Sequence, residues 1–248
     1  MNSSDQNSMA IKFHNVSKSY VIGNDDNRSF FNWLVSLGKR KPNSNILNVL
    51  DGISFEIRKG DVVGIMGKNG VGKSTILKLI SGIIQCDTGS IETNGSIIPL
   101  IELGVGFQPE ATAKENIIMY GLILGIAKSQ IKNKVNDILR FAELEKFADT
   151  KIKNFSSGMY TRLAFSTAIQ VNPDILLIDE VLAVGDIFFQ QKSFDSIRTF
   201  KDNHKTIVLV SQNTDVILEL CNKAILLENG KIIKEGTPED VIEQYRHD

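Results

Sequence analysis

The chain has few cysteines, little net charge and no long apolar run, and each shortage removes a class of protein. Its two cysteines, Cys86 and Cys221, lie far apart without metal-ligand spacing, so we expect a reduced, cytoplasmic protein. The 28 basic residues balance 29 acidic ones, so no binding to nucleic acid is predicted. No apolar run approaches the ~20 residues of a membrane-spanning helix, and the polar start Met1–Ser8 lacks a signal-peptide pattern. Any role at a membrane is therefore expected at its surface.

One glycine-rich segment predicts a phosphate-binding loop. Residues 67–74 read Gly-Lys-Asn-Gly-Val-Gly-Lys-Ser and fit G-x-x-x-x-G-K-[ST], between an apolar run at 61–66 and a helical pattern at 74–80. Such a loop turns successive backbone N–H groups and a helix N-terminus towards a polyphosphate. We predict a nucleoside triphosphate here, with Lys73 on the outer phosphates and the Ser74 hydroxyl in the Mg²⁺ shell. The candidate residues are Gly67, Lys68, Asn69, Gly70, Val71, Gly72, Lys73, Ser74 and Thr75.

A second segment predicts catalytic carboxylates. The apolar run 175–178 indicates a strand buried on both faces, and it ends in Asp179 and Glu180. Ligands of open α/β sheets bind at the carboxyl ends of the strands. We expect Asp179 to hold Mg²⁺ through water, and Glu180 to polarise the water that attacks the terminal phosphate. Alone, this pair is also typical of a helix N-cap or a solvated turn; after a phosphate loop, catalysis is favoured.

The order of the remaining patterns predicts an α/β fold with a mostly parallel sheet and a helical insertion. No internal repeat is visible, so we expect one nucleotide-binding unit. Asn94-Gly95 and Asn229-Gly230 predict hairpin turns. The expected strands are edge strands at 11–21 and 49–57, hairpins within 90–98 and 224–233, and a strand at 206–211; the expected helices lie within 113–148, 157–171 and 187–200, with a last one from Pro238.

Residues 154–160, Asn-Phe-Ser-Ser-Gly-Met-Tyr, carry a resemblance to the ATP-binding subunits of ABC transporters. The signature motif of that family is usually Leu-Ser-Gly-Gly-Gln, and it contacts the ATP held by the opposite subunit. Residues 155–159 depart at the first, third and fifth positions but retain Ser156 and Gly158. The resemblance implies a homodimer with two ATP molecules between its subunits, contacted by Ser156, Ser157 and Gly158. Without it, Ser-Ser-Gly is simply a common helix-cap sequence.

The same resemblance assigns four further positions. Gln108 falls at the Q-loop glutamine, which touches Mg²⁺, although it could also cap a turn before Pro109. Tyr20 matches the aromatic residue that stacks on adenine, or is an ordinary surface tyrosine. Asp186 ends the D-loop. Gln212 stands where the family normally has a catalytic histidine; its amide can donate to phosphate but carries no positive charge, so we expect a slow ATPase.

Within that family, the chain most resembles the ATPase subunits of polysaccharide exporters, on residues 103–110, 155–166 and 178–186. The resemblance implies one ABC ATP-binding domain over 1–248: a P-loop NTPase core, an N-terminal antiparallel β subdomain and a helical subdomain at about 109–171. It also implies ATP and Mg²⁺ as ligands. The subunit would lie on the cytoplasmic face of the cell membrane and drive a separate permease that moves a lipid-linked glycan such as O-antigen, capsular polysaccharide or teichoic acid.

The segment from about 24 to 48 is predicted to insert a short amphipathic helix. Its apolar residues Phe30, Trp33, Leu34 and Leu37 follow helical spacing, and basic residues flank them. We favour contact with the permease, the membrane or the lipid-linked substrate. The alternative is a helix that packs on the protein's own sheet.

Two other functions are kept as alternatives. A soluble ABC-type ATPase that acts mechanically on nucleic acid or ribosomes usually has tandem nucleotide domains or a long coiled-coil insertion, and this chain shows neither. A small-molecule kinase would share the phosphate loop alone. It would leave residues 156–160 unexplained.

Overall fold

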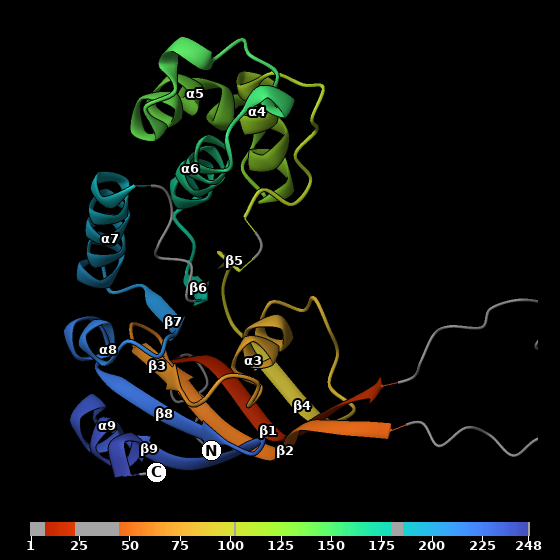
Figure 1. Cartoon of the computed structure of the whole chain (residues 1–248), viewed down its shortest axis with the longest axis vertical. Coiled ribbons are helices and arrows are strands. Elements are labelled where there is room, and N and C mark those ends of the chain that lie inside the picture. The colour runs from red at the N-terminus through yellow and green to blue at the C-terminus, as the bar shows by residue number, and fades with distance from the viewer. Residues whose placement is uncertain (1–7, 23–44, 102, 180–185, 248) are drawn as a thin grey trace, which may run out of the picture.

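The computed structural model describes residues 8–22, 45–101, 103–179 and 186–247. These residues form a body that contains two sheets, with a helical lobe standing above it (Figure 1). The strands are β1 (Met9–Ile22), β2 (Asn45–Arg58), β3 (Val62–Met66), β4 (Thr88–Thr93), β5 (Ile97–Pro99), β6 (Ile175–Asp179), β7 (Thr206–Val210), β8 (Lys223–Glu228) and β9 (Lys231–Gly236). The α-helices are α3 (Lys73–Ile80), α4 (Ala113–Ile123), α5 (Lys128–Ala142), α6 (Ser157–Ala168), α7 (Ile187–Asp202), α8 (Thr214–Leu220) and α9 (Pro238–His247).

The larger sheet has the order β5-β6-β7-β3-β8-β9 and is parallel except for β9. Its central strands β3 and β7 are buried throughout, as the continuous apolar runs predict for strands covered on both faces. Alternate residues of β7 enter different apolar clusters. Ile207 and Leu209 join the cluster that includes the helical lobe, whereas Val208 and Val210 join the one that includes α3 and the smaller sheet. The predicted mostly parallel α/β fold is confirmed.

The smaller sheet is antiparallel, with the order β2-β1-β4, which confirms an N-terminal antiparallel β subdomain. The prediction that residues 11–21 form an edge strand is wrong, because β1 pairs with β2 on one side and with β4 on the other. The alternation of apolar residues along β1 does not show how many strands pair with it. Phe13 of β1 stacks on Phe55 of β2, with ring centroids 4.4 Å apart, and both rings are buried.

The predicted hairpin within 90–98 is also wrong. β4 pairs with β1 in the small sheet, whereas β5 pairs in parallel with β6 in the large one. Gly95 has φ 127°, and the next residue, Ser96, donates through its backbone N–H to the Asp174 carboxylate at 2.9 Å. The Asn-Gly pair therefore marks a change of sheet. The second Asn-Gly pair does form its predicted hairpin, between β8 and β9.

Helices α4, α5 and α6 form the lobe and lie between β5 and β6 in the chain (Figure 1). The predicted apolar face of α5 is buried, including Ile131 and Ile138. Thr112 and Glu115 form a capping box at the start of α4. After α6, a short 3-10 turn ends at Asn172, which has φ 51° and stands before Pro173. Helix termination before this proline was predicted from the sequence.

Residues 45–48, at the far end of the segment predicted as an insertion, belong to β2 and pair with the end of β1. Pairing of Tyr20 with Leu47 extends the two-stranded ladder into this region. The predicted amphipathic helix, with Trp33, lies outside the described residues. In the part of the chain that the structure describes, we find no helix with the length and apolar character needed to cross a bilayer.

Candidate nucleotide-binding site

The phosphate loop joins β3 to α3 and curves around the ammonium group of Lys73. The Lys73 Nζ atom donates to the carbonyl of Gly67 at 2.7 Å and to the carbonyl of Lys68 at 2.9 Å. The lysine side chain is 6% exposed. These contacts hold the positive charge within the loop, beside the N-terminus of α3. A polyphosphate bound there would be stabilised both by the ammonium charge and by the helix dipole.

Two glycines are required by the path of this loop. A Cβ atom on Gly67, which has φ 146°, would lie 2.3 Å from the carbonyl oxygen of Leu227 in β8. A Cβ atom on Gly72, which has φ 107°, would lie 2.9 Å from the carbonyl oxygen of Val49 in β2. Both distances are shorter than any ordinary contact, so the loop packs backbone against backbone on two strands. The glycine pattern is therefore explained by the fold as well as by phosphate geometry.

Three neighbouring parallel strands, β6, β7 and β3, bring the predicted groups to one edge of the sheet. Asp179 ends β6 in register with Val210, and Gln212 follows β7. The Gln212 amide donates to the Asn69 side chain of the phosphate loop. β6 and β3 are two positions apart in this sheet, so their axes are about 10 Å apart. Glu180 lies outside the described residues, and its catalytic role stays a prediction.

Gln108 is exposed, in a turn that is held by a buried asparagine. Its backbone N–H donates to Asn116 Oδ1 at 2.7 Å, and its carbonyl accepts from Asn116 Nδ2 at 3.1 Å. Ala111 also donates its backbone N–H to the Gln108 carbonyl at 3.0 Å. The backbone of Gln108 therefore makes the turn, and its side chain remains available for the predicted metal contact.

The predicted nucleobase residue Tyr20 lies near the end of β1 and is 39% exposed. The ammonium of Lys18 lies over its ring, 5.6 Å from the centroid. This distance is within the range of a cation–π contact. An exposed ring of this kind can stack on a base, and the role remains a prediction.

The predicted signature segment begins α6 in the helical lobe. Ser156 is the N-cap, and its side chain accepts from the Met159 backbone N–H at 3.2 Å. Ser157 begins the helix, and both serines are exposed. Met159, which replaces the usual glutamine, packs against the apolar cluster of the lobe. α6 belongs to the lobe and α3 to the body (Figure 1). In the predicted homodimer, the N-terminus of α6 would contact the nucleotide held by the second subunit.

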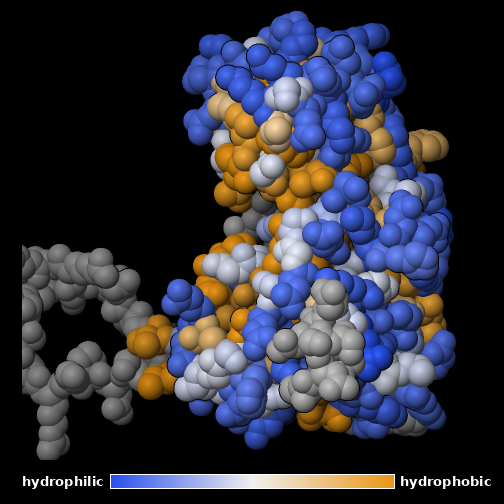
Figure 2. Space-filling model, turned by 180° about the vertical axis from the view of Figure 1, so that it is seen from behind, coloured by the Kyte–Doolittle hydropathy of each residue, from blue (hydrophilic) through white to orange (hydrophobic). Residues whose placement is uncertain are grey.

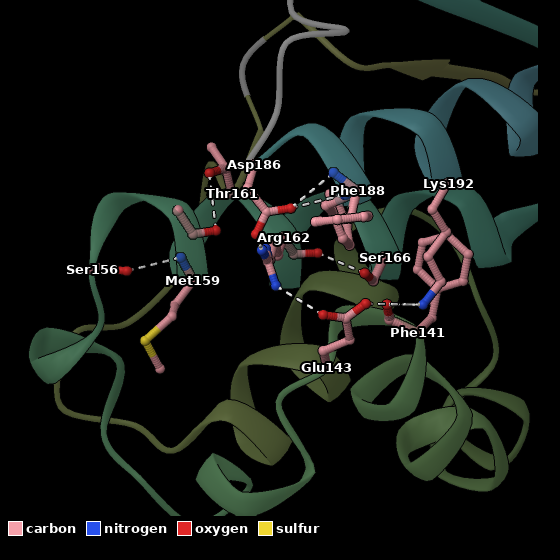
Figure 3. A network of polar contacts seen from close by, with 12 residues as sticks. Phe141, Glu143, Ser156, Met159, Thr161, Arg162, Ser166, Asp186, Phe188 and Lys192 are labelled. Carbon is pink, nitrogen blue, oxygen red and sulfur yellow. Dashed lines mark hydrogen bonds and ion pairs between the residues drawn. The ribbon is translucent and has the colours of Figure 1, made fainter.

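A polar network that sequence reasoning missed ties α6 to α7 (Figure 3). The Arg162 guanidinium contacts Asp186, donates to Glu143 at 3.2 Å, and lies 5.1 Å from the ring centroid of Phe189. Asp186 is the N-cap of α7 and accepts from the backbone N–H groups of Phe188 and Phe189. These bonds, first that from Phe189, lower the pKa of Asp186, and the charge of Arg162 adds to them. The sequence signal was an aspartate directly before a helical pattern.

The donor set suits a magnesium nucleotide. Ser74, Gln108 and Asp179 offer the oxygen ligands that Mg²⁺ prefers, and Lys73 offers a fixed cation. A Mg²⁺ site of this kind takes much of its coordination from phosphates and water. Among the described residues, no cluster of three or more histidine, cysteine, aspartate or glutamate side chains is placed to hold a metal ion by itself.

The fold and the phosphate loop together define a P-loop nucleotide-binding protein. Residues 50–183 match the family described as ABC transporter. The chain therefore belongs to the ABC transporter family. Among solved structures, it is similar to an ATP-binding cassette in a dimeric post-hydrolysis state with ADP and Pi. That comparison has a TM-score of 0.72 at 23% identity and covers 92% of this chain and 98% of the other, so it shows the fold.

Curated relatives share more of the sequence. The O-antigen export system ATP-binding protein RfbB of Klebsiella pneumoniae is 43% identical over 197 residues, covering 79% of this chain and 80% of the relative. The teichoic acids export ATP-binding protein TagH of Staphylococcus haemolyticus is 37% identical over 238 residues, covering 96% and 88%. RfbB of Myxococcus xanthus is 43% identical over 210 residues, or 84% of this chain. The match spans 48% of that relative, about half its length.

Proposed function

We propose that the chain is the ATP-hydrolysing subunit of an exporter that moves a lipid-linked polysaccharide through a separate membrane permease. The observation that carries the ATPase function is the convergence of Lys73, Asp179 and Gln212 at one edge of the parallel sheet. The polysaccharide class is supported by the names of the relatives, which concern O-antigen and teichoic acid export.

Each group at this edge has a chemical task. Lys73 and the loop N–H groups hold the outer phosphates. Ser74, Gln108 and Asp179 hold Mg²⁺, which neutralises phosphate charge. Glu180 polarises the water that attacks the terminal phosphate. Positioning and charge stabilisation supply most of the catalysis in such reactions.

The proposed active assembly is a homodimer on the cytoplasmic face of the membrane. Residues 1–248 act as one ABC domain, and its helical subdomain, about 109–171, presents Ser156, Ser157 and Gly158 to the ATP of the second copy. The exposed N-cap of α6 supports this arrangement, because its backbone N–H groups suit an anion. Asp186 contributes by fixing the end of the D-loop against Arg162.

Gln212 offers a direct test of the hydrolytic site. Gln212→His should raise the hydrolysis rate less than tenfold, equivalent to under ~1.4 kcal/mol of barrier, because it exchanges one donor for a better one. Gln212→Ala should be slower than the parent, since removing a positioned donor costs up to ~3 kcal/mol. Steady-state phosphate release measures both. Equal rates for alanine and glutamine would show that Gln212 does not touch the nucleotide.

The permease contact is proposed beside Gln108, where apolar side chains are exposed. Seen from behind, hydrophobic surface gathers on the lower part of the helical lobe and continues on the body beneath it (Figure 2). Val105 is 59% exposed and Ile123 is 62% exposed. A Cβ atom on Gly106 would lie 2.6 Å from Ile123 Cδ1, so Ile123 lies directly over the segment that leads to Gln108. A partner bound here would contact the loop that carries the metal ligand.

The proposed function is tested by purifying the tagged chain from detergent-solubilised membranes of its own host. A multi-spanning permease should co-purify, and Ile123→Glu should reduce its recovery about tenfold, because a buried charge opposes an apolar interface. Ile233→Glu, at an exposed isoleucine of β9, is the matched control and should recover the permease normally. ATPase activity of the isolated chain should be the same in both. Recovery of ribosomes or nucleic acid in place of a permease would favour the mechanical alternative, which the names of the relatives do not support.

A further inference from the structure

Asp87, in the turn between α3 and β4, binds the residues that precede Tyr20 through its carboxylate. Asp87 accepts from Lys18 Nζ at 2.6 Å, from the Ser19 backbone N–H at 2.7 Å and from the Ser19 hydroxyl at 2.7 Å. Its own backbone N–H donates to the Ser17 carbonyl at 2.9 Å. One residue therefore binds three consecutive residues of β1, directly ahead of the tyrosine.

The bond from Lys18 to Asp87 is charge-assisted. This bond, followed by those from Ser19, lowers the pKa of Asp87 to about 2. The carboxylate is therefore ionised at neutral pH. A single exposed ion pair contributes little, but here three donors converge on one carboxylate.

Asp87 binds β1 at a point where the pairing of β1 with its neighbouring strands is irregular. The register of β1 against β2 shifts between Val16 and Lys18 and again between Lys18 and Ser19. The register against β4 shifts between His14 and Ser17, where that pairing ends. A bulge redirects the side chains that follow it. The register with β2 is regular from Ser19 onwards, where Tyr20 pairs with Leu47, so the conformation of this bulge sets the direction of the Tyr20 side chain. Asp87 binds the residues of the bulge.

The contacts of Asp87 also determine which face of the Tyr20 ring is open. Asp87 holds Lys18, and the Lys18 ammonium lies over the tyrosine ring, 5.6 Å from its centroid. A cation over one face leaves the opposite face for a flat partner. Asp87 is connected to the phosphate loop through α3, so one short segment, residues 67–87, links the phosphate and base ends of the site.

We propose that Asp87 is a positioning residue for the nucleobase, fixing Lys18 and Ser19 so that the Tyr20 ring presents one face to the adenine of ATP. This inference rests on the proposed ATPase function and on the predicted role of Tyr20, which is to stack on adenine. It predicts that Asp87 acts on affinity for the base and leaves the phosphate subsite unchanged.

The test compares binding of ATP with binding of inorganic tripolyphosphate, which has no base, by calorimetry on the full chain. Stacking on an aromatic ring contributes enough that Tyr20→Ala should weaken ATP binding about tenfold, and Asp87→Ala should approach this loss. Asp87→Asn should lose less, because an amide oxygen still accepts from Ser19. Glu56→Gln removes another ion pair of the same sheet, that with Lys12 at 2.7 Å, and should leave both ligands unaffected.

Tripolyphosphate binding should be the same in every variant, and Tyr20→Ala combined with Asp87→Ala should be no weaker for ATP than Tyr20→Ala alone. If Tyr20→Ala leaves ATP binding unchanged, the base platform itself is wrong. If Tyr20→Ala weakens ATP binding but Asp87→Ala does not, the platform stands and the positioning role is overturned. Loss of tripolyphosphate binding in Asp87→Ala would also overturn it, because the damage would then extend to the phosphate loop.

Discussion

Replacing Lys73 with alanine should abolish productive ATP binding and lower hydrolysis by at least about a hundredfold, the cost of removing a positioned charge from developing phosphate charge. Lys73 is buried, and its ammonium is fixed by two carbonyls of the loop. No ordering of a flexible side chain is therefore needed when the phosphates arrive. Calorimetry with ATP and a phosphate-release assay measure the two effects.

Lys78→Ala is the matched control for this variant. Lys78 lies in the last turn of the same helix, α3, away from the phosphate loop. Lys78 is half-buried, and its replacement should leave both ATP binding and hydrolysis within about twofold of the parent, because the residue lies outside the loop. Undiminished hydrolysis in Lys73→Ala would remove the phosphate-loop assignment.

Replacing Glu180 with glutamine should retain ATP binding while lowering hydrolysis at least about a hundredfold, because the amide fits the site but cannot act on the attacking water as a carboxylate does. In the proposed homodimer, ATP then remains between the two subunits. A dimer should accumulate in the presence of Mg²⁺-ATP, and size-exclusion chromatography with light scattering measures it.

Glu228→Gln provides a comparison from the same sheet. β8 runs parallel to β3, and Glu228 ends it at the same edge as Asp179 ends β6, but on the other side of the phosphate loop. This variant should hydrolyse ATP normally and form no ATP-dependent dimer. A Glu180→Gln protein that stays monomeric and keeps normal activity would show that the catalytic carboxylate is elsewhere.

The parts of the fold that sequence predicted well are those fixed by local chemistry. The phosphate loop, the apolar strand that ends at Asp179 and the buried face of α5 each follow from a short pattern, and the structure contains all three elements. The Asn94-Gly95 prediction failed because the choice of strand partner is a long-range property. The Asn-Gly pair permits a tight turn, but the strand that pairs with β5 is β6, which follows the whole helical lobe in the sequence.

The contacts of Asp87 and Arg162 could not be predicted for the same reason. Asp87 meets Ser19 across 68 positions of sequence, and Arg162 meets Asp186 across 24. Neither residue lies in a local sequence pattern that identifies its partner. The two contacts can be recognised only in the folded protein, where β1 lies beside β4 and α6 beside α7.

The attachment of the helical lobe to α7 has a mechanical consequence. The lobe is one contiguous segment, so the backbone enters it once after β5 and leaves it once before β6. With these two backbone connections alone, the lobe could rotate about them as on a hinge. Further contacts attach the lobe to α7. Among them are the ion pair of Arg162 in α6 with Asp186 and the hydrogen bond from Lys192 of α7 to the Phe141 carbonyl at 2.8 Å.

A rotation of the lobe that kept these contacts would move α7 with it. The N-cap of α7, Asp186, lies a few residues beyond the end of β6, so such a movement would reach the chain just after Asp179, the predicted metal ligand. A partner bound to the surface around Ile123 and a nucleotide bound at the end of β6 would then be coupled through one rotation of the lobe and α7.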